Sequence, residues 1–286
     1  MPIGCRSDEG LSAPVIKRLK TAPWCDVITL DLVPQQFGHS YNLTEAMLYE
    51  IRPDLVLITG DRVEMCAAAA AAFHNKVKIA HLYAGIVNDP VTTFDDVDRH
   101  CITLLSDVIM CEDRSSAIRV NMLRAAMDLP QAIPNVVGIT HLDDLEIDLS
   151  KVPIGEAGYY ADYDLLLLNE EPLMEPPKWT KWGKERYLIH IGGNPDGIIP
   201  DQGADEYYSS LPRPQFLGLL KNCRRFITNS SAAIYEAPYF LKPEQIVMVG
   251  QRNCNRPAVE CKPGGSDRVV EVLRDYANAY MDRSKD

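Results

Sequence analysis

Apolar runs alternate with helix-like stretches in the first half of the chain. The run Asp54–Thr59 is apolar, rich in β-branched residues and stopped by a glycine, and Val77–Leu82 repeats this pattern. Val63–His74 lies between them and contains six consecutive alanines. Alanine is the best helix former, and its small side chain lets a helix lie close to a sheet. Continuous apolar runs of this kind are typical of parallel strands buried on both faces. The pattern therefore predicts a strand–helix–strand unit over residues 54–85.

The same alternation returns after an acidic, irregular stretch at residues 140–163. Strands are expected in the second half at 164–168, 187–191, 225–228 and 245–250, with a closing helix at 266–281. Because strand and helix alternate throughout, we expect an α/β fold of two Rossmann-like domains with parallel sheets. The boundary falls in the irregular stretch and gives an N-terminal domain over residues 1–140 and a C-terminal domain over 141–286. In such sheets ligands bind beyond the carboxyl ends of the strands.

Composition and charge exclude several classes of protein. The chain has 286 residues, with 29 Lys and Arg against 40 Asp and Glu, a net charge of −11. This balance argues against a broad nucleic-acid or anionic-membrane surface, although a few local arginines suffice to hold a phosphate. No apolar run is long enough to span a membrane, and the N-terminus lacks an apolar signal core, so a cytoplasmic protein is expected. The eight cysteines form no CxxC pair and no zinc-like spacing with histidine, which predicts reduced thiols and no metal site.

Two segments of the first half carry candidate acid/base groups. In TGDR, Asp61 directly follows a buried strand and a glycine, where a carboxylate acts as acid or base or, alternatively, caps the next helix. In FDDVDRH, Asp96 lies three residues before Arg99 and four before His100, so these side chains share one helix face. A carboxylate beside a histidine suits proton transfer. The alternative is an ordinary first helical turn, where acidic residues are favoured in any case.

Two segments of the second half suit an anionic ligand. In ITNSSAAIYEAP, a strand end is followed by Ser230 and Ser231 and then by a helical stretch that contains Glu236. Successive backbone N–H groups and hydroxyls at a helix start bind phosphate, and an acidic residue further along accepts hydrogen bonds from ribose. The alternative is a plain serine cap. In VGQRNCNRP, Arg252 and Arg256 stand close together after a strand and suit a phosphate contact, or simply a surface loop.

Five segments, taken in order, resemble the UDP-N-acetylglucosamine 2-epimerase family, especially its UDP-sugar-hydrolysing branch. They are PDLVLITGDRVEMCAAAAAAF, KIAHLYAG, DDVDRH, IGGNPDG, and NSSAAIYEAP with VGQRNCNR. The resemblance implies two domains of the glycosyltransferase-B type with a cleft between them, UDP held mainly by the second domain, and a homodimer or homotetramer. It also implies elimination of UDP from a UDP-sugar to give a 2-acetamidoglucal, followed by addition of water or UDP. That chemistry needs no metal or redox cofactor.

The resemblance also assigns roles to individual residues. The catalytic candidates that it implies are Asp61, Asp96, His100 and Tyr83. The candidates for binding the UDP-sugar are Arg6, Asn194, Ser230, Ser231, Glu236 and Arg252.

Two positions depart from the family pattern. Tyr83 stands where the family has a glutamate that exchanges protons, and a tyrosine of pKa about 10 is a poor base at neutral pH. Asn169-Glu170 stands where the family has His-Pro or His-Arg. These departures keep two alternatives open besides an epimerase-like enzyme. One is a glycosyltransferase of the same fold that uses a nucleotide sugar, and the other is a non-catalytic protein that binds one.

Overall fold

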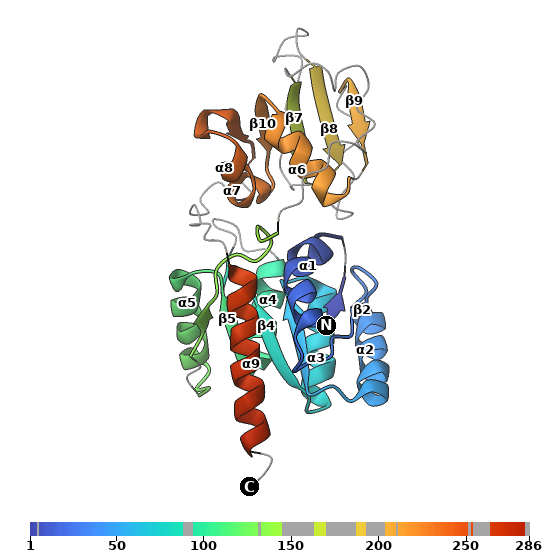
Figure 1. The fold of residues 1–286 in the computed structure, drawn as a ribbon, viewed down its shortest axis with the longest axis vertical. Helices are drawn as coiled ribbons and strands as arrows, with labels where there is room; N and C mark the ends of the chain where they lie inside the picture. Colours follow the sequence, from blue (N-terminus) through green and yellow to red (C-terminus); the bar gives the residue numbers. More distant parts are fainter. Residues whose placement is uncertain are drawn as a thin grey trace. The chain divides into compact units, whose positions relative to one another are not determined.

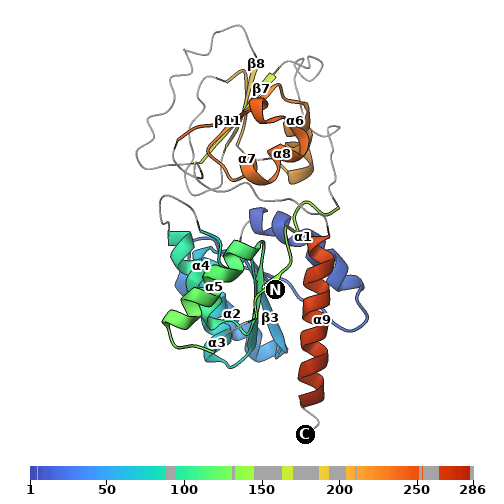
Figure 2. The same ribbon diagram turned by 90° about the vertical axis from the view of Figure 1, so that its left-hand side faces the viewer.

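A computed structural model describes residues 1–4, 6–87, 94–130, 133–144, 163–169, 187–192, 204–209, 211–250, 253 and 264–283, without the side chains of 6–8 and 281–283. The chain forms two compact units (Figures 1 and 2). The first unit comprises Met1–Val87, Thr92–Asp144 and Cys261–Asp286, and the second comprises Asn88–Val91 and Leu145–Glu260.

The first unit is built on a parallel four-stranded sheet. In spatial order its strands are β3 (Leu55–Thr59), β4 (Lys78–Leu82), β5 (Val108–Cys111) and β6 (Asn135–Val136). A separate parallel pair joins β1 (Pro2–Ile3) to β2 (Leu30–Asp31). The helices of this unit are α1 (Arg6–Thr21), α2 (Phe37–Ile51), α3 (Val63–His74), α4 (Phe94–Leu105), α5 (Arg114–Ala126) and α9 (Gly265–Arg283).

The predicted strand–helix–strand unit is present as β3, α3 and β4. Alanines of α3 are buried against Ile58 and Ile79 of the sheet, which explains why small residues fill this helix. The turn after β4 needs Gly85, because its φ is +78° and a Cβ there would clash with the Ser116 carbonyl oxygen. This close approach brings the start of α5 against the end of β4.

The second unit contains a parallel five-stranded sheet. Its strands in spatial order are β11 (Ile246–Met248), β10 (Arg225–Thr228), β7 (Tyr163–Leu168), β8 (Tyr187–Gly192) and β9 (Glu206–Tyr208). Its helices are α6 (Arg213–Asn222), α7 (Ala232–Tyr235), α8 (Ala237–Phe240) and the short 3-10 turn Pro243–Gln245. Leu165, Phe226 and Leu217 belong to its core. The α/β class with parallel sheets is therefore confirmed for both halves of the chain.

The closing helix differs from the sequence-based division, which assigned residues 141–286 to one C-terminal domain. Helix α9 runs beside α1 of the first unit in Figures 1 and 2, and its Val269 and Leu273 are buried in the same core cluster as Val15 and Leu19 of α1. The apolar face of a terminal helix packs where matching apolar surface exists, and sequence order does not reveal that place. The C-terminal assignment of 264–283 is corrected accordingly.

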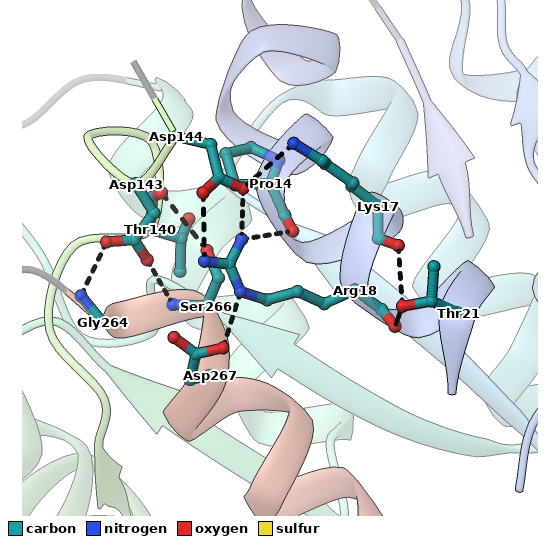
Figure 3. Close-up of polar contacts among 10 residues, drawn as sticks. All are labelled: Pro14, Lys17, Arg18, Thr21, Thr140, Asp143, Asp144, Gly264, Ser266 and Asp267. Atoms are coloured by element: carbon teal, nitrogen blue, oxygen red, sulfur yellow. Dashed lines mark hydrogen bonds and ion pairs between the residues drawn. The ribbon is translucent and has the colours of Figure 1, made fainter. Parts of the chain in front are cut away.

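Polar contacts fix the start of α9 on the first unit (Figure 3). The Asp143 carboxylate accepts hydrogen bonds from the backbone N–H groups of Gly264 at 2.6 Å and Ser266 at 2.7 Å. Arg18 of α1 donates to Asp267 at 2.7 Å and to Asp144 at 2.6 Å. A carboxylate at a helix N-terminus satisfies N–H groups that lack partners within the helix, so Asp143 caps α9.

Within the described ranges, no helix combines the length and the apolar character that a membrane span requires.

Candidate active site

Asp61 lies at the carboxyl end of β3, beyond the turn made by Gly60, whose φ is +85°. The alternative that Asp61 caps α3 is wrong, because Arg62 occupies the N-cap position of that helix. Instead the Asp61 carboxylate forms an ion pair with Nη2 of Arg99 on α4. The Asp61 side chain is 25% exposed, so one face of this carboxylate remains open to a ligand.

Arg99 joins the two carboxylates that the sequence singled out. Its Nη1 donates to Oδ1 of Asp96 at 3.0 Å and to the Ile86 carbonyl at 2.7 Å. The Arg99 side chain is only 5% exposed and that of Asp96 only 2%. Asp96 and Arg99 meet because they are three residues apart on one helix. The result is a buried Asp96–Arg99 pair that presents a guanidinium to the more exposed Asp61.

His100 follows Arg99 on α4 and has a different environment. It is half-buried, and its Nδ1 is buried with no hydrogen-bond partner among the residues described. Burial and the nearby Arg99 guanidinium lower the pKa of His100, while the Asp96 carboxylate opposes that shift. His100 is therefore neutral at pH 7, and no Asp96–His100 hydrogen bond is present within the described part of the chain.

Tyr83 occupies the turn after β4, with φ of +69°, and its ring is buried. Its hydroxyl lies 2.7 Å from the Thr140 hydroxyl and 3.2 Å from Nδ1 of His141, and it accepts the Thr140 backbone N–H at 3.1 Å. Burial raises the pKa of Tyr83 to about 12, against the opposing effect of these hydrogen bonds. A hydroxyl held in this way links the turn after β4 to the segment of Thr140 and His141, and it does not supply a base at neutral pH.

In the second unit the predicted serine segment follows β10. Asn229 is buried and pairs with the backbone of Asn169 at the end of β7 through two hydrogen bonds of 2.8 Å each. The Ser230 N–H donates to the Thr228 hydroxyl at 2.9 Å, and the Ser230 hydroxyl accepts the Ala232 N–H at 3.3 Å. Asn229 thus fixes the adjacent ends of two parallel strands, and the serines begin where those strands end.

The helical stretch expected after these serines is shorter than predicted. One helical stretch containing Glu236 was expected, but the structure has two four-residue helices, α7 and α8, with Glu236 between them. Pro238 lies in the first turn of α8, and proline favours a new helix start over continuation. Such short helices carry little dipole, so a phosphate here would depend on individual N–H groups and hydroxyls.

Glu236 is buried and forms an ion pair with Arg213 at the start of α6, with Nη1 and Oε1 2.9 Å apart. No sequence pattern indicates this partner, which lies 23 residues earlier. The pair places a cation next to the carboxylate expected to receive ribose hydroxyls.

Three of the predicted binding residues have no described side chain. Asn194 and Arg252 lie outside the described residues, and Arg6 begins α1 but its side chain is not among those described. In the part of the chain that is described, no three His, Cys, Asp or Glu side chains gather as a metal ion would require.

Comparison with known proteins adds to this geometry. A family model described as UDP-N-acetylglucosamine 2-epimerase matches residues 33–161, which carry Asp61, Tyr83 and Asp96. Among curated proteins, a Legionella pneumophila UDP-N,N'-diacetylbacillosamine 2-epimerase (hydrolyzing) is 28% identical over 87% of this chain. A Neisseria meningitidis UDP-N-acetylglucosamine 2-epimerase is 26% identical over 77% of it. The chain is thus similar in sequence to UDP-N-acetylglucosamine 2-epimerases, and the family model matches residues 33–161.

The matches span 70% of the length of the Legionella relative and 61% of the Neisseria relative. Two solved structures agree over nearly all of both chains. The S. aureus MnaA–UDP complex has a TM-score of 0.76 at 17% identity and covers 97% of this chain and 96% of its own. The N. meningitidis UDP-GlcNAc 2-epimerase bound to UDP-GlcNAc has a TM-score of 0.70 at 16% identity, with 96% and 98% covered. At these identities the likeness shows the fold, which is of the glycosyltransferase-B type.

The structure also shows two residues, one in the candidate site and one near it in sequence, that sequence reasoning missed. Arg99 lies in the segment FDDVDRH, but the sequence alone assigned it no role. Its ion pair with Asp61 indicates such a role. Glu64 is fully buried, with its carboxylate bonded to Nε of Arg62 at 2.7 Å and to the Gln35 N–H at 3.1 Å. A charged residue three positions after Asp61, in a mostly apolar helix, was the available signal.

Proposed function

We propose that this chain is a UDP-N-acetylglucosamine 2-epimerase-like enzyme that eliminates UDP from a UDP-sugar and then adds water or UDP back. The proposal rests on the Asp61–Arg99–Asp96 group near the carboxyl end of β3. It also rests on the match of residues 33–161 to the UDP-N-acetylglucosamine 2-epimerase family model. The names of the relatives support a UDP-linked 2-acetamido sugar as substrate. The hydrolysing route is supported by the Legionella relative, which is named a hydrolyzing 2-epimerase.

In this proposal Asp61 takes the proton from C2 of the sugar, because it is the more exposed of the two carboxylates. Arg99 keeps Asp61 in place and supplies a fixed positive charge. Asp96 is buried and acts through Arg99. His100, neutral at pH 7, is the remaining candidate for proton exchange, whereas Tyr83 acts by positioning.

The second unit supplies the proposed UDP site. Ser230 and Ser231 offer hydroxyls and backbone N–H groups for the diphosphate, and Glu236 offers a carboxylate for the ribose. Arg6, Asn194 and Arg252 stay predicted members of the binding set. The expected cleft and the expected homodimer or homotetramer also stay predictions, and sedimentation velocity measures the oligomeric state directly.

Proton NMR of the protein with UDP-N-acetylglucosamine in deuterated water tests the function. We expect deuterium at C2 and release of free UDP with N-acetylmannosamine. Asp61→Asn is expected to abolish turnover while UDP still binds by calorimetry. Asp54→Asn, an exposed aspartate at the opposite end of β3, serves as the matched control and should behave as wild type.

Two outcomes would contradict the proposal. Substrate that binds the wild-type protein and remains unchanged would favour a glycosyltransferase or a non-catalytic binding protein. A near-normal rate for Asp61→Asn would remove Asp61 from the chemistry.

A further inference from the structure

His81 is a fully buried histidine on β4 that the proposed chemistry does not use. Its Nε2 lies 2.9 Å from the carbonyl oxygen of Gly60, the residue before Asp61. Its Nδ1 lies 3.1 Å from the hydroxyl of Thr103 on α4. The imidazole therefore connects the turn that carries Asp61 with the helix that carries Asp96 and Arg99.

The chemistry of the two contacts decides which ring nitrogen carries the proton. A carbonyl oxygen only accepts hydrogen bonds, so Nε2 must donate to Gly60. Burial lowers the pKa of His81 to about 4, and the neighbouring His100 acts in the same direction. The ring is thus neutral at pH 7, with its single proton on Nε2, and Nδ1 is left as an acceptor that shares the one Thr103 hydroxyl proton with the Arg99 carbonyl.

Hydrogen bonds hold the two peptide groups on either side of Gly60, and His81 holds the one that joins Gly60 to Asp61. The Gly60 N–H donates to the Leu82 carbonyl at 3.2 Å, while the Gly60 carbonyl accepts from His81. Gly60 has a positive φ and no side chain, so little else restrains this turn. The plane of the Gly60–Asp61 peptide sets the direction in which Asp61 leaves the backbone.

The contacts close into a ring through the proposed site. The Thr103 hydroxyl also lies 2.8 Å from the Arg99 carbonyl, one helical turn earlier. Arg99 in turn forms the ion pair with Asp61. Backbone and side chain of the same catalytic residue are therefore restrained through one buried imidazole.

We propose that His81 is a positioning residue for Asp61, which fixes the Gly60–Asp61 peptide by donating from Nε2 and links it to α4 through Thr103. The inference rests on the proposed function, in which Asp61 removes the C2 proton. It gives His81 a role that a histidine merely filling the core would not have. A core histidine is replaceable by any side chain of similar size, whereas a donor to Gly60 is not.

The test compares His81→Gln with His81→Leu. The Gln amide N–H reaches the position of Nε2, so it keeps the donor to Gly60, while Leu keeps similar volume and removes it. We expect kcat of His81→Leu with UDP-N-acetylglucosamine to fall by about 10- to 100-fold, the usual cost of a misplaced catalytic group. KM and the UDP affinity should change little, and His81→Gln should recover most of kcat.

Thr103 provides a second pair of variants. Thr103→Ser keeps the hydroxyl and should retain near-normal kcat, while Thr103→Val keeps the shape and should lower it. The inference is overturned if His81→Leu keeps a kcat close to wild type, or if Gln and Leu at position 81 are equally impaired.

A readout without turnover separates this inference from the proposed function. Selective 15N labelling of the six histidines allows the tautomer of each ring to be read by NMR. We expect His81 to carry its proton on Nε2, and the Asp61 amide resonance to shift in His81→Leu but not in His81→Gln. If the wild-type protein does not turn over UDP-N-acetylglucosamine, the proposed function fails and these spectra alone decide the role of His81. A proton on Nδ1, or an unmoved Asp61 amide, would overturn it.

Discussion

Replacing Arg99 with methionine removes the cation that joins the two carboxylates of the proposed site. Met retains much of the volume of the arginine stem but has no donor. The contacts that disappear include the ion pair to Asp61, the 3.0 Å bond to Asp96 and the 2.7 Å bond to the Ile86 carbonyl. The variant therefore leaves a carboxylate in a buried position without the arginine that neutralised it.

The burial of each group sets the size of the effect. Asp96 is 2% exposed and Arg99 5%, so their pair is shielded from solvent, and removing one partner of a buried pair costs about 3–5 kcal/mol. The Asp61 side chain is 25% exposed, so solvent screens that pair more and its loss adds little. We expect Arg99→Met to lower the unfolding free energy of the first unit by about 3 kcal/mol. That is a large fraction of the roughly 5–15 kcal/mol by which domains are stable.

The measurement has to report on the first unit alone, because two units need not unfold together. Hydrogen exchange of β3 and β4 amides in increasing urea, read by mass spectrometry of peptides, meets this requirement. Asp96→Asn combined with Arg99→Met is the matched control, since it removes the buried charge of Asp96 together with that of Arg99. The double variant should recover much of the lost stability. A loss below about 1 kcal/mol for Arg99→Met, within the range of exposed pairs, would refute the reasoning. So would a double variant as unstable as the single one.

Two further predictions concern the second unit and the Tyr83 turn. Ser230→Ala combined with Glu236→Ala should weaken UDP binding by about 10-fold or more, since hydrogen bonds to charged groups are lost, and unchanged affinity by calorimetry would remove this site. Tyr83→Phe should lower the stability of the first unit by about 1–2 kcal/mol, because the N–H and hydroxyl of Thr140 lose their buried partner, yet leave the pH dependence of kcat unchanged. A changed pH profile would show instead that the Tyr83 hydroxyl exchanges protons.

Local pattern predicted much of the fold because the relevant signals lie within short segments. The helix Val63–His74 was predicted with the bounds that the structure shows, since alanines and flanking apolar strands specify it without help from distant residues. The strand at 225–228 agrees in the same way. The i,i+3 contact between Asp96 and Arg99 also follows from helix geometry alone, and the structure confirms it.

Contacts between distant segments were not predictable from pattern. Tyr83 and Thr140 are 57 residues apart, and only the approach of the chain to β4 brings them together. The return of α9 to the first unit depends on the Asp143 cap and on apolar surface contributed by α1, neither of which marks the sequence near 264–283. Amphipathic spacing predicts that a helix packs, but it does not say against what.

The arrangement of arginines explains how so acidic a chain is suited to an anionic substrate. A net charge of −11 opposes the approach of a diphosphate if the charges act together, but exposed charges beyond about 8 Å are screened at physiological salt. What a ligand meets is therefore local. In the first unit Arg99 accompanies Asp61 and Asp96, and in the second Arg213 accompanies Glu236. Each carboxylate proposed for proton transfer or ribose binding thus lies beside a buried or half-buried arginine, and Asp61 and Asp96 share theirs. The proposed sites avoid the repulsion that the overall charge suggests, and each arginine additionally fixes the direction of the carboxylate beside it.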